Sequence, residues 1–129
     1  MKLIYVSSPY TGDLERDLEY ARRACRTVME CGECPIAPRL IYSAILDDMA
    51  PAERKPSAEM SQALLHRCNE VWAFGPVTGS GMKREIAEAK RLYMPVRKKV
   101  LAENLAQDSS LPPTDMKRGE ETQWSMEMS

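Results

Sequence analysis

Short apolar segments alternate with longer amphipathic segments along the first hundred residues of the chain. The apolar segments, which we predict to be strands, are residues 3–6, 34–38, 71–74 and 94–97. Residues 71–74 contain no polar position, which is typical of a strand whose sheet is covered on both faces.

The amphipathic segments predict helices because their apolar residues recur at steps of three and four. Asp13 is the expected cap of the first helix, and Ser80 is the expected cap of the last. The predicted helices are residues 14–31, residues 40–46, a segment that begins at Pro56 or Ser57 and runs to 68, and residues 82–93. Residues 47–56 are predicted to be a loop, with Pro51 and Pro56 as helix breakers. The side chains expected in the core are Leu14, Leu18, Ala21, Cys25, Val28, Met60, Ala63, Leu64, Cys68, Met82, Ile86, Ala89 and Tyr93.

Strands that alternate with helices indicate an open α/β sandwich with a parallel sheet. Ligands of such folds bind beyond the carboxyl ends of the strands. Residues 7–13 and 75–81 are the two turn-rich loops that follow strands in this way, so we expect the chemistry there.

The alternating pattern ends near Ala102, which divides the chain into an α/β domain over residues 1–102 and a tail over residues 103–129. The tail has no periodicity, and its end alternates charged residues with Trp124, Met126 and Met128. We expect the tail to be mobile or docked on a neighbouring subunit.

Composition excludes several classes of protein. The 129 residues are 43% apolar and 29% charged, as in globular domains rather than disordered ones. With 18 basic against 19 acidic residues and only 6% aromatics, neither nucleic acid nor an acidic membrane surface is an expected partner. No apolar run approaches the roughly 20 residues of a membrane span, and the apolar start is too short for a signal peptide. We therefore expect a cytoplasmic protein with four reduced cysteines.

Glu85 is the candidate functional residue of the last predicted helix. At about 100° per residue it lies roughly 60° from the apolar stripe, beside the core. Glu85 does not fit a capping box, which would need an acid three residues after Ser80, where Lys83 stands. It does not fit an ion pair within the helix either, because the positions three and four residues away carry no lysine or arginine. A carboxylate near a helix N-terminus gains roughly 0.3–1 kcal/mol from the dipole. Gly79 and Gly81, beside Ser80, leave backbone N–H groups open to a phosphate or a sugar hydroxyl.

Three stretches of the chain resemble the nucleoside 2-deoxyribosyltransferase-like family, and most closely its small bacterial and phage members. They are residues 3–10, residues 68–75, and Ser80-Gly81-Met82 followed by Glu-Ile-Ala-Glu-Ala over residues 85–89. The likeness spans about residues 1–98, and the Gly-Met to Glu-x-x-x-Ala segment is its most specific part. It implies a doubly wound parallel sheet with helices on both faces, so we expect four or five strands, the fifth near Val100.

The resemblance also implies roles for individual residues. Glu85 would attack C1′ of a deoxyribose to form a covalent glycosyl-enzyme, which another base or water resolves. Tyr10 matches a family tyrosine whose hydroxyl lies near the nucleophile. The expected substrate contacts are Ser7, Ser8, Pro9, Gly12, Asp47, Asp48, Gly75, Gly79, Ser80, Gly81 and Met82.

The chain departs from the family pattern at three positions. Ser8 stands where the family usually has glycine, and Asn69 replaces an acid that commonly precedes the third strand. Gly79 stands where transferases carry an aspartate, about six residues before the nucleophile. These departures weaken the expectation of transferase activity more than that of a nucleoside-like ligand.

The cysteines and the single histidine are weaker candidates. Cys31 and Cys34 form a CxxC pair, but it spans a helix end, and a zinc site would need His66 and Cys68 as further ligands. We expect no metal and no organic cofactor. Cys25 and Cys68 fit the core, and His66 fits a surface or half-buried position.

Two clusters of basic residues are candidate phosphate sites. Arg22, Arg23 and Arg26 alternate with acids and fit a solvated helix face. Lys83 and Arg84 lie beside the glycine loop and are the stronger candidates.

Together with the resemblance, the residues predict an enzyme that cleaves or transfers the N-glycosidic bond of a (deoxy)nucleoside or nucleoside 5′-monophosphate, and the resemblance implies a homo-oligomer. The alternative is a nucleotide-binding module on the same fold that senses or sequesters its ligand without turnover. A further possibility is a subunit whose tail completes the pocket of its partner.

Overall fold

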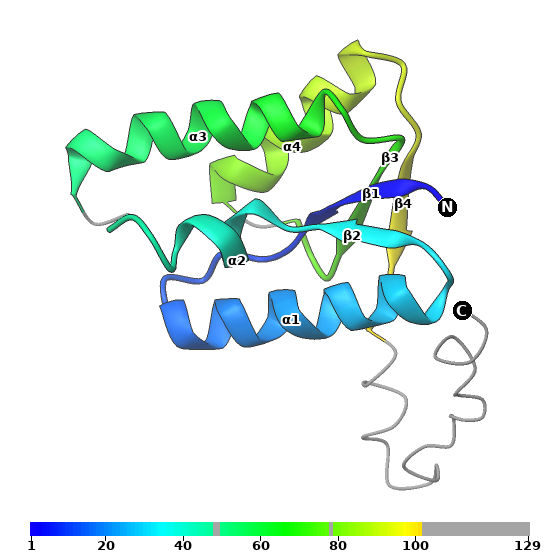
Figure 1. Ribbon diagram of the computed structural model, residues 1–129, viewed down its shortest axis with the longest axis horizontal. Coiled ribbons are helices and arrows are strands. Elements are labelled where there is room, and N and C mark those ends of the chain that lie inside the picture. Colours follow the sequence, from blue (N-terminus) through cyan, green and yellow to red (C-terminus); the bar gives the residue numbers. More distant parts are fainter. Residues whose placement is uncertain (48–49, 78, 102–129) are drawn as a thin grey trace, which may run out of the picture.

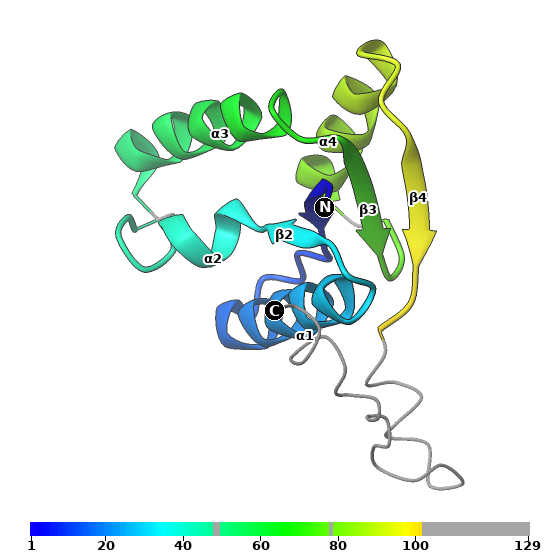
Figure 2. The same ribbon diagram turned by 45° about the vertical axis from the view of Figure 1, so that its right-hand side comes forward.

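The computed structural model describes residues 1–47, 50–77 and 79–101 of the chain (Figure 1). Its elements in chain order are β1 (Leu3–Ser7), α1 (Leu14–Glu30), β2 (Cys34–Ile36), α2 (Pro38–Tyr42), α3 (Pro51–Leu65), β3 (Glu70–Phe74), α4 (Gly79–Arg91) and β4 (Val96–Lys99). The strands form one parallel sheet in the order β2-β1-β3-β4. Helix α1 covers one face, and α3 and α4 cover the other (Figures 1 and 2). The predicted α/β sandwich is confirmed, with four strands among the described residues.

The strand order places a switch point between β1 and β3. The chain leaves β1 through α1 to reach β2 on one side, and then crosses to β3 on the other side of β1. Ser7 pairs in register with Ala73, so β1 and β3 end at the same edge of the sheet. The loops that follow them therefore meet where open α/β folds bind ligands.

Two apolar clusters lie on opposite faces of the sheet. Ile4 and Val6 of β1 pack toward α1, whereas Tyr5 packs in the cluster on the other face, with Leu65 and Ala89 from the side of α3 and α4. Because successive strand residues point to opposite faces, Ser7 lies on the same face as Tyr5. No helix within the described ranges has the length and apolarity that crossing a membrane demands.

Helix α1 forms largely as its pattern predicts. Asp13 caps it by accepting a hydrogen bond from the Arg16 amide at 3.2 Å, and the helix ends before Gly32, whose φ is +83°. Leu14 is an exception, since it is 52% exposed in the first turn. Asp17 is buried instead, because it binds the preceding loop.

Helix α3 differs from the prediction of a loop over residues 47–56. It begins at Pro51, whose missing N–H costs nothing in the first turn, and it continues through Pro56 at the loss of one backbone hydrogen bond.

The inner face of α3 also differs from the prediction. Met60 and Ala63 are exposed, whereas Ser57 and Ser61 are half-buried above Leu65, the one fully buried residue of the helix. Ser61 interacts with the buried hydroxyl of Tyr5. A polar partner beneath α3 thus explains why part of its inner face carries serine rather than apolar residues.

The amino-terminal edge of the sheet carries an ion cluster around the buried carboxylate of Glu70, whose partners Lys2 and Arg97 are half exposed. Glu70 accepts hydrogen bonds from Arg97 Nε at 2.9 Å, Lys2 Nζ at 2.8 Å and Trp72 Nε1 at 2.8 Å, and these donors hold the pKa of Glu70 down at about 2. Asn69 lies at the same edge, where its Oδ1 accepts from the Leu3 amide at 2.7 Å. Asn69 therefore joins β1 to β3 at the end opposite the two predicted ligand loops.

Candidate functional site

Glu85 lies in the second turn of α4. The helix begins at Gly79, so Ser80 is part of its first turn and is not the cap that we predicted. The first turn contains no acid, and the dipole effect expected for Glu85 is correspondingly smaller. Met82 and Ala89 are buried as predicted, but Tyr93 lies beyond the helix end, 95% exposed with φ +58°.

Both carboxylate oxygens of Glu85 accept hydrogen bonds from β1. Ser7 Oγ donates to Oε1 at 2.6 Å, and Tyr5 Oη donates to Oε2 at 2.8 Å. Tyr5 and Ser7 are each 1% exposed. They point to the same face of the strand, and this is the face of the sheet that α4 covers. The carboxylate is therefore fixed in position by two rigid donors.

The electrostatic surroundings of Glu85 pull in two directions. Burial raises the pKa of Glu85 above its ordinary value, while the bonds from Ser7 and Tyr5 and the charges of Arg39 and Arg84 oppose that rise. Burial and the nearby carboxylate raise the pKa of Tyr5 far above its usual range. Tyr5 consequently keeps its proton and acts as a hydrogen-bond donor throughout the physiological range.

The loop after β1 is held by Asp17. Its carboxylate, 1% exposed, accepts hydrogen bonds from the Thr11 amide at 3.0 Å, the Thr11 hydroxyl at 2.7 Å and the Gly12 amide at 3.2 Å. Gly12 has φ +97°, which favours glycine. Asp17 was not among the predicted site residues, although an acid one turn inside a helix that follows a Thr-Gly turn is a signal for such an arrangement.

Arg39 joins the same edge of the sheet from α2, and sequence reasoning missed it. Its Nη1 donates to the Pro9 carbonyl at 2.9 Å, and its guanidinium lies 4.7 Å from the centre of the Tyr10 ring. Tyr10 is 46% exposed. The tyrosine hydroxyl that donates to Glu85 belongs to Tyr5, and the role expected of Tyr10 beside Glu85 stays a prediction.

The two predicted loops meet as expected. A Cβ atom at Gly75, which has φ +74°, would lie 2.6 Å from Tyr20 Oη and 3.1 Å from Pro9 Cγ. A Cβ atom at Gly79, which also has φ +74°, would lie 3.9 Å from the Cβ and backbone oxygen of Tyr10. Gly75 therefore lets the loop after β3 approach the loop after β1 closely, whereas at Gly79 the positive φ and not the available space favours glycine.

The remaining predicted contacts are distributed unevenly. Ser8 and Pro9 are buried, as is the side chain of Met82, while Gly81 is half-buried in the first turn of α4. Ser80 is exposed and accepts a hydrogen bond of 3.4 Å from Arg84.

Two predictions concern segments near or beyond the limits of the described residues. Asp47 is exposed, and its amide donates to Glu53 of α3. Asp48 and the tail over residues 103–129 lie outside the described residues. The contribution of both aspartates to a base site stays a prediction.

None of the hydrogen bonds to Glu85 described above comes from a cysteine or from His66, although Cys68 packs in the same apolar cluster as Tyr5. Cys31 is exposed at the end of α1, Cys34 is half-buried in β2, and all four thiols are free. Within the described ranges, no three potential ligands from His, Cys, Asp and Glu gather where they could hold a metal ion. His66 follows α3 at the surface, as predicted, with Nε2 2.7 Å from the Glu88 carboxylate.

Comparison with known proteins gives a family but no activity. Residues 2–99 match the family model described as a domain of unknown function, DUF7768. No curated protein matches the chain. The matched range contains every described side chain that contacts Glu85.

Proposed function

The chain belongs to the DUF7768 family, and we propose that its α/β domain cleaves or transfers the N-glycosidic bond of a nucleoside or nucleoside 5′-monophosphate. One observation carries the proposal: the Glu85 carboxylate is held on both oxygens, by Ser7 and by Tyr5, at the carboxyl end of β1. The substrate class comes from the resemblance to the nucleoside 2-deoxyribosyltransferase-like family, in which a glutamate at this point of the helix attacks the sugar.

The proposed reaction has two steps. In the first, a Glu85 oxygen forms a bond to C1′ while the C1′–N bond breaks, and the base leaves with the bonding electrons and is protonated by solvent. In the second, water or another base attacks C1′ and gives a proton to solvent, and the Glu85 carboxylate is released as its bond to C1′ breaks. Hydrolysis and transfer differ only in the second nucleophile.

The surroundings of Glu85 suit this chemistry. Burial removes water from a nucleophile that water would otherwise solvate, which is why the pKa of Glu85 is raised. The hydroxyls of Tyr5 and Ser7 keep the carboxylate oriented by donating hydrogen bonds to it. Because the pKa of Tyr5 is raised far above its usual range, Tyr5 does not transfer its proton to Glu85. Activity that needs ionised Glu85 is therefore expected to fall as the pH drops through this raised pKa.

Positive groups near Glu85 suit an anionic substrate. Arg39 and Arg84 both act on the Glu85 charge, and Arg84 also lies beside Ser80 in the first turn of α4. A 5′-phosphate near Ser80 and Gly81 would meet Arg84 and the helix N-terminus together. The monophosphate is accordingly the form of substrate that we favour.

A binding module without turnover is the second candidate. Gly79 stands where related transferases carry an aspartate, and its φ of +74° is a conformation that an aspartate adopts only with strain. The loop is thus built for glycine and not for that carboxylate. The replacement of the family's acid by Asn69 does not bear on the site, because Asn69 joins the strands at the opposite edge.

Release of free base separates the two candidates. The protein is incubated with purine and pyrimidine nucleosides, deoxynucleosides and their 5′-monophosphates, and free base is measured by chromatography. We expect release by the wild type, loss of release in Glu85→Ala and Glu85→Gln, and retained ligand binding in both variants. Glu88→Gln, one turn further along α4, is the matched control and keeps its activity, because Glu88 pairs with His66 and Arg91 at the surface.

Two outcomes of this assay would contradict the proposed enzymatic activity. Release by Glu85→Ala at the wild-type rate would exclude Glu85 as nucleophile. Binding of a nucleotide by the wild type without any release would favour the binding module.

The compartment and the assembly belong to the same proposal. We place the protein in the cytoplasm, where its four free thiols stay reduced and nucleotides are abundant. A homo-oligomer is expected from the family resemblance, and light scattering on the full chain measures it.

A further inference from the structure

A groove of about 760 Å³ lies between α1, β2 and α2, beside the edge strand β2 of the sheet. Its floor is apolar and is formed by Cys25, Met29, Ile36, Leu40 and Ile41. Met29 is 38% exposed and Ile41 is 48% exposed. The groove therefore leaves apolar side chains open to solvent in the part of the chain that the structure describes.

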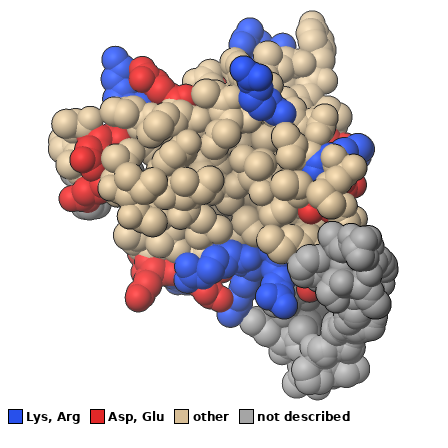
Figure 3. All heavy atoms as spheres, viewed as in Figure 1, with Lys and Arg blue, Asp and Glu red and all other residues tan. Residues whose placement is uncertain are grey.

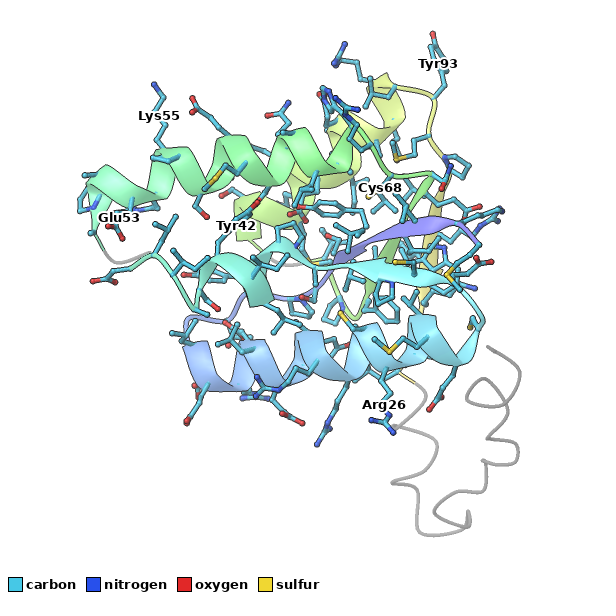
Figure 4. All side chains as sticks on the ribbon, viewed as in Figure 1. Arg26, Tyr42, Glu53, Lys55, Cys68 and Tyr93 are labelled. Atoms are coloured by element: carbon cyan, nitrogen blue, oxygen red, sulfur yellow. The ribbon has the colours of Figure 1, made fainter. Side chains whose placement is uncertain are left out.

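The rim of the groove is basic. Arg22, Arg23 and Arg26 line it from α1, and Figure 3 shows basic side chains gathered along this helix. Glu19 is the only acid of the lining, and its carboxylate pairs with both Arg22 at 3.1 Å and Arg23 at 3.3 Å. Arg26 extends away from α1 in Figure 4 and forms no ion pair with any residue of the described ranges.

The C-terminal part of the sequence has the complementary character. Residues 102–129 contain six acidic and two basic residues, whereas residues 1–101 contain 16 basic and 13 acidic ones. Within residues 119–129 there are three glutamates and no lysine or arginine, together with Trp124, Met126 and Met128. Opposite charges and matching apolar side chains are the two features that a docking segment for this groove needs.

The covalent connection allows this segment to reach the groove. Leu101 is 1% exposed and packs with Cys25 and Val28, so the described chain ends on the α1 side of the sheet. The 23 positions from Leu101 to Trp124 span up to about 75 Å when extended. Helix α1, with 17 residues, is only about 26 Å long. A tether of this kind gives the segment an effective concentration near the millimolar range.

We propose that residues 119–129 dock in the groove between α1, β2 and α2 of their own chain. Trp124, Met126 and Met128 cover the apolar floor, and the glutamates of the segment face the arginines of the rim. The inference rests on the groove and on charge complementarity, and it is independent of the function proposed for Glu85.

Tryptophan fluorescence of the full chain tests this docking. The chain has two tryptophans, and Trp72 is buried, so the difference between the wild type and Trp124→Phe reports Trp124 alone. We expect Trp124 to emit at shorter wavelength than in urea and to be quenched several-fold less by acrylamide. Raising the salt concentration should partly restore quenching, because the charges of the rim are exposed.

Variants of the groove supply the controls. Arg26→Glu and Ile41→Ser each change an exposed side chain and should return Trp124 emission and quenching toward the values in urea. Arg54→Glu makes the same charge change on α3, on the opposite face of the sheet, and should leave both unchanged.

Three results would overturn the proposal. Trp124 could be quenched as strongly in the native protein as in urea. Both groove variants could leave its fluorescence unchanged while circular dichroism shows an intact fold. Protection that rises with protein concentration would assign the groove to the segment of a second copy and exclude docking within one chain.

Discussion

Replacing Tyr5 by phenylalanine removes one of the two hydroxyls that hold Glu85 and leaves the buried ring in place. The hydroxyl donates to Oε2 at 2.8 Å, and Ser7 remains bound to Oε1. A hydrogen bond to a charged group contributes about 1.5–3 kcal/mol to stability. We therefore expect Tyr5→Phe to lower the free energy of unfolding by about 1.5–3 kcal/mol at a pH where Glu85 is ionised.

The loss should depend on pH with a definite sign. The bond from Tyr5 lowers the pKa of Glu85, so its removal raises that pKa further in the folded protein. At a pH above the pKa of Glu85 in both proteins, the variant is less stable than the wild type by the full contribution of the hydrogen bond. The difference shrinks as the pH falls through them, because a protonated carboxyl no longer needs the second donor. The interaction of Tyr5 with Ser61 contributes a part of the loss that does not change with pH.

Urea unfolding of both proteins at about pH 8 and at about pH 4.5 measures this effect. Tyr93→Phe is the matched control, since Tyr93 is 95% exposed and the same loss of a hydroxyl should change stability by less than about 0.5 kcal/mol. A loss of equal size at both pH values, or no loss at all, would refute the reasoning, because Glu85 would then not be the charged partner of Tyr5.

Two further predictions concern the loops around Glu85. Asp17→Ala leaves the donors of Thr11 and Gly12 without their acceptor, which should cost about 1–3 kcal/mol in urea unfolding; equal stability would show that water replaces the carboxylate. Gly75→Ala requires a left-handed alanine whose Cβ meets Tyr20 Oη at 2.6 Å, so its thermal midpoint should fall by the equivalent of at least about 1–2 kcal/mol, and an unchanged midpoint would contradict the close approach of the two loops.

The sheet could be predicted because buried parallel strands have a strong local signature. Residues 71–74 are apolar without alternation, and the structure places them in β3 with every residue buried. The alternation of such segments with helices was enough to predict the parallel sandwich. The exact strand order depends on long-range pairing, for which the chain carries no local signal.

Helix α3 shows where the hydrophobic pattern fails. Its inner face carries Ser57 and Ser61, and Ser61 lies against the Tyr5 hydroxyl. The hydrophobic pattern therefore indicates Met60 and Ala63, which lie on the solvent side. The prediction treats Pro51 as a helix breaker, but proline is well tolerated at the start of a helix, where the structure has it.

The sequence predicts the candidate nucleophile Glu85 but not the residues that hold it. Glu85 could be found because it lies beside an apolar stripe and has no basic neighbour in its own helix. Ser7 is among the predicted site residues, but as a substrate contact and not as a partner of Glu85, and Tyr5 was not found. The two lie 78 and 80 residues before Glu85, and Tyr5 has the local pattern of a core residue. The strand alternation does place both on one face, but only the tertiary packing shows that α4 covers that face. Arg39 was missed for the same reason.

The most direct test of the central proposal is the location of a sugar on Glu85 during turnover. The wild type is mixed with a nucleotide that it cleaves, quenched in acid and digested with trypsin, which cuts after Arg84 and Lys90 and releases residues 85–90. Mass spectrometry should find this peptide carrying the sugar, with fragmentation placing it on Glu85 rather than Glu88. Release of base without any sugar on this peptide, or with the sugar on another residue, would contradict the account.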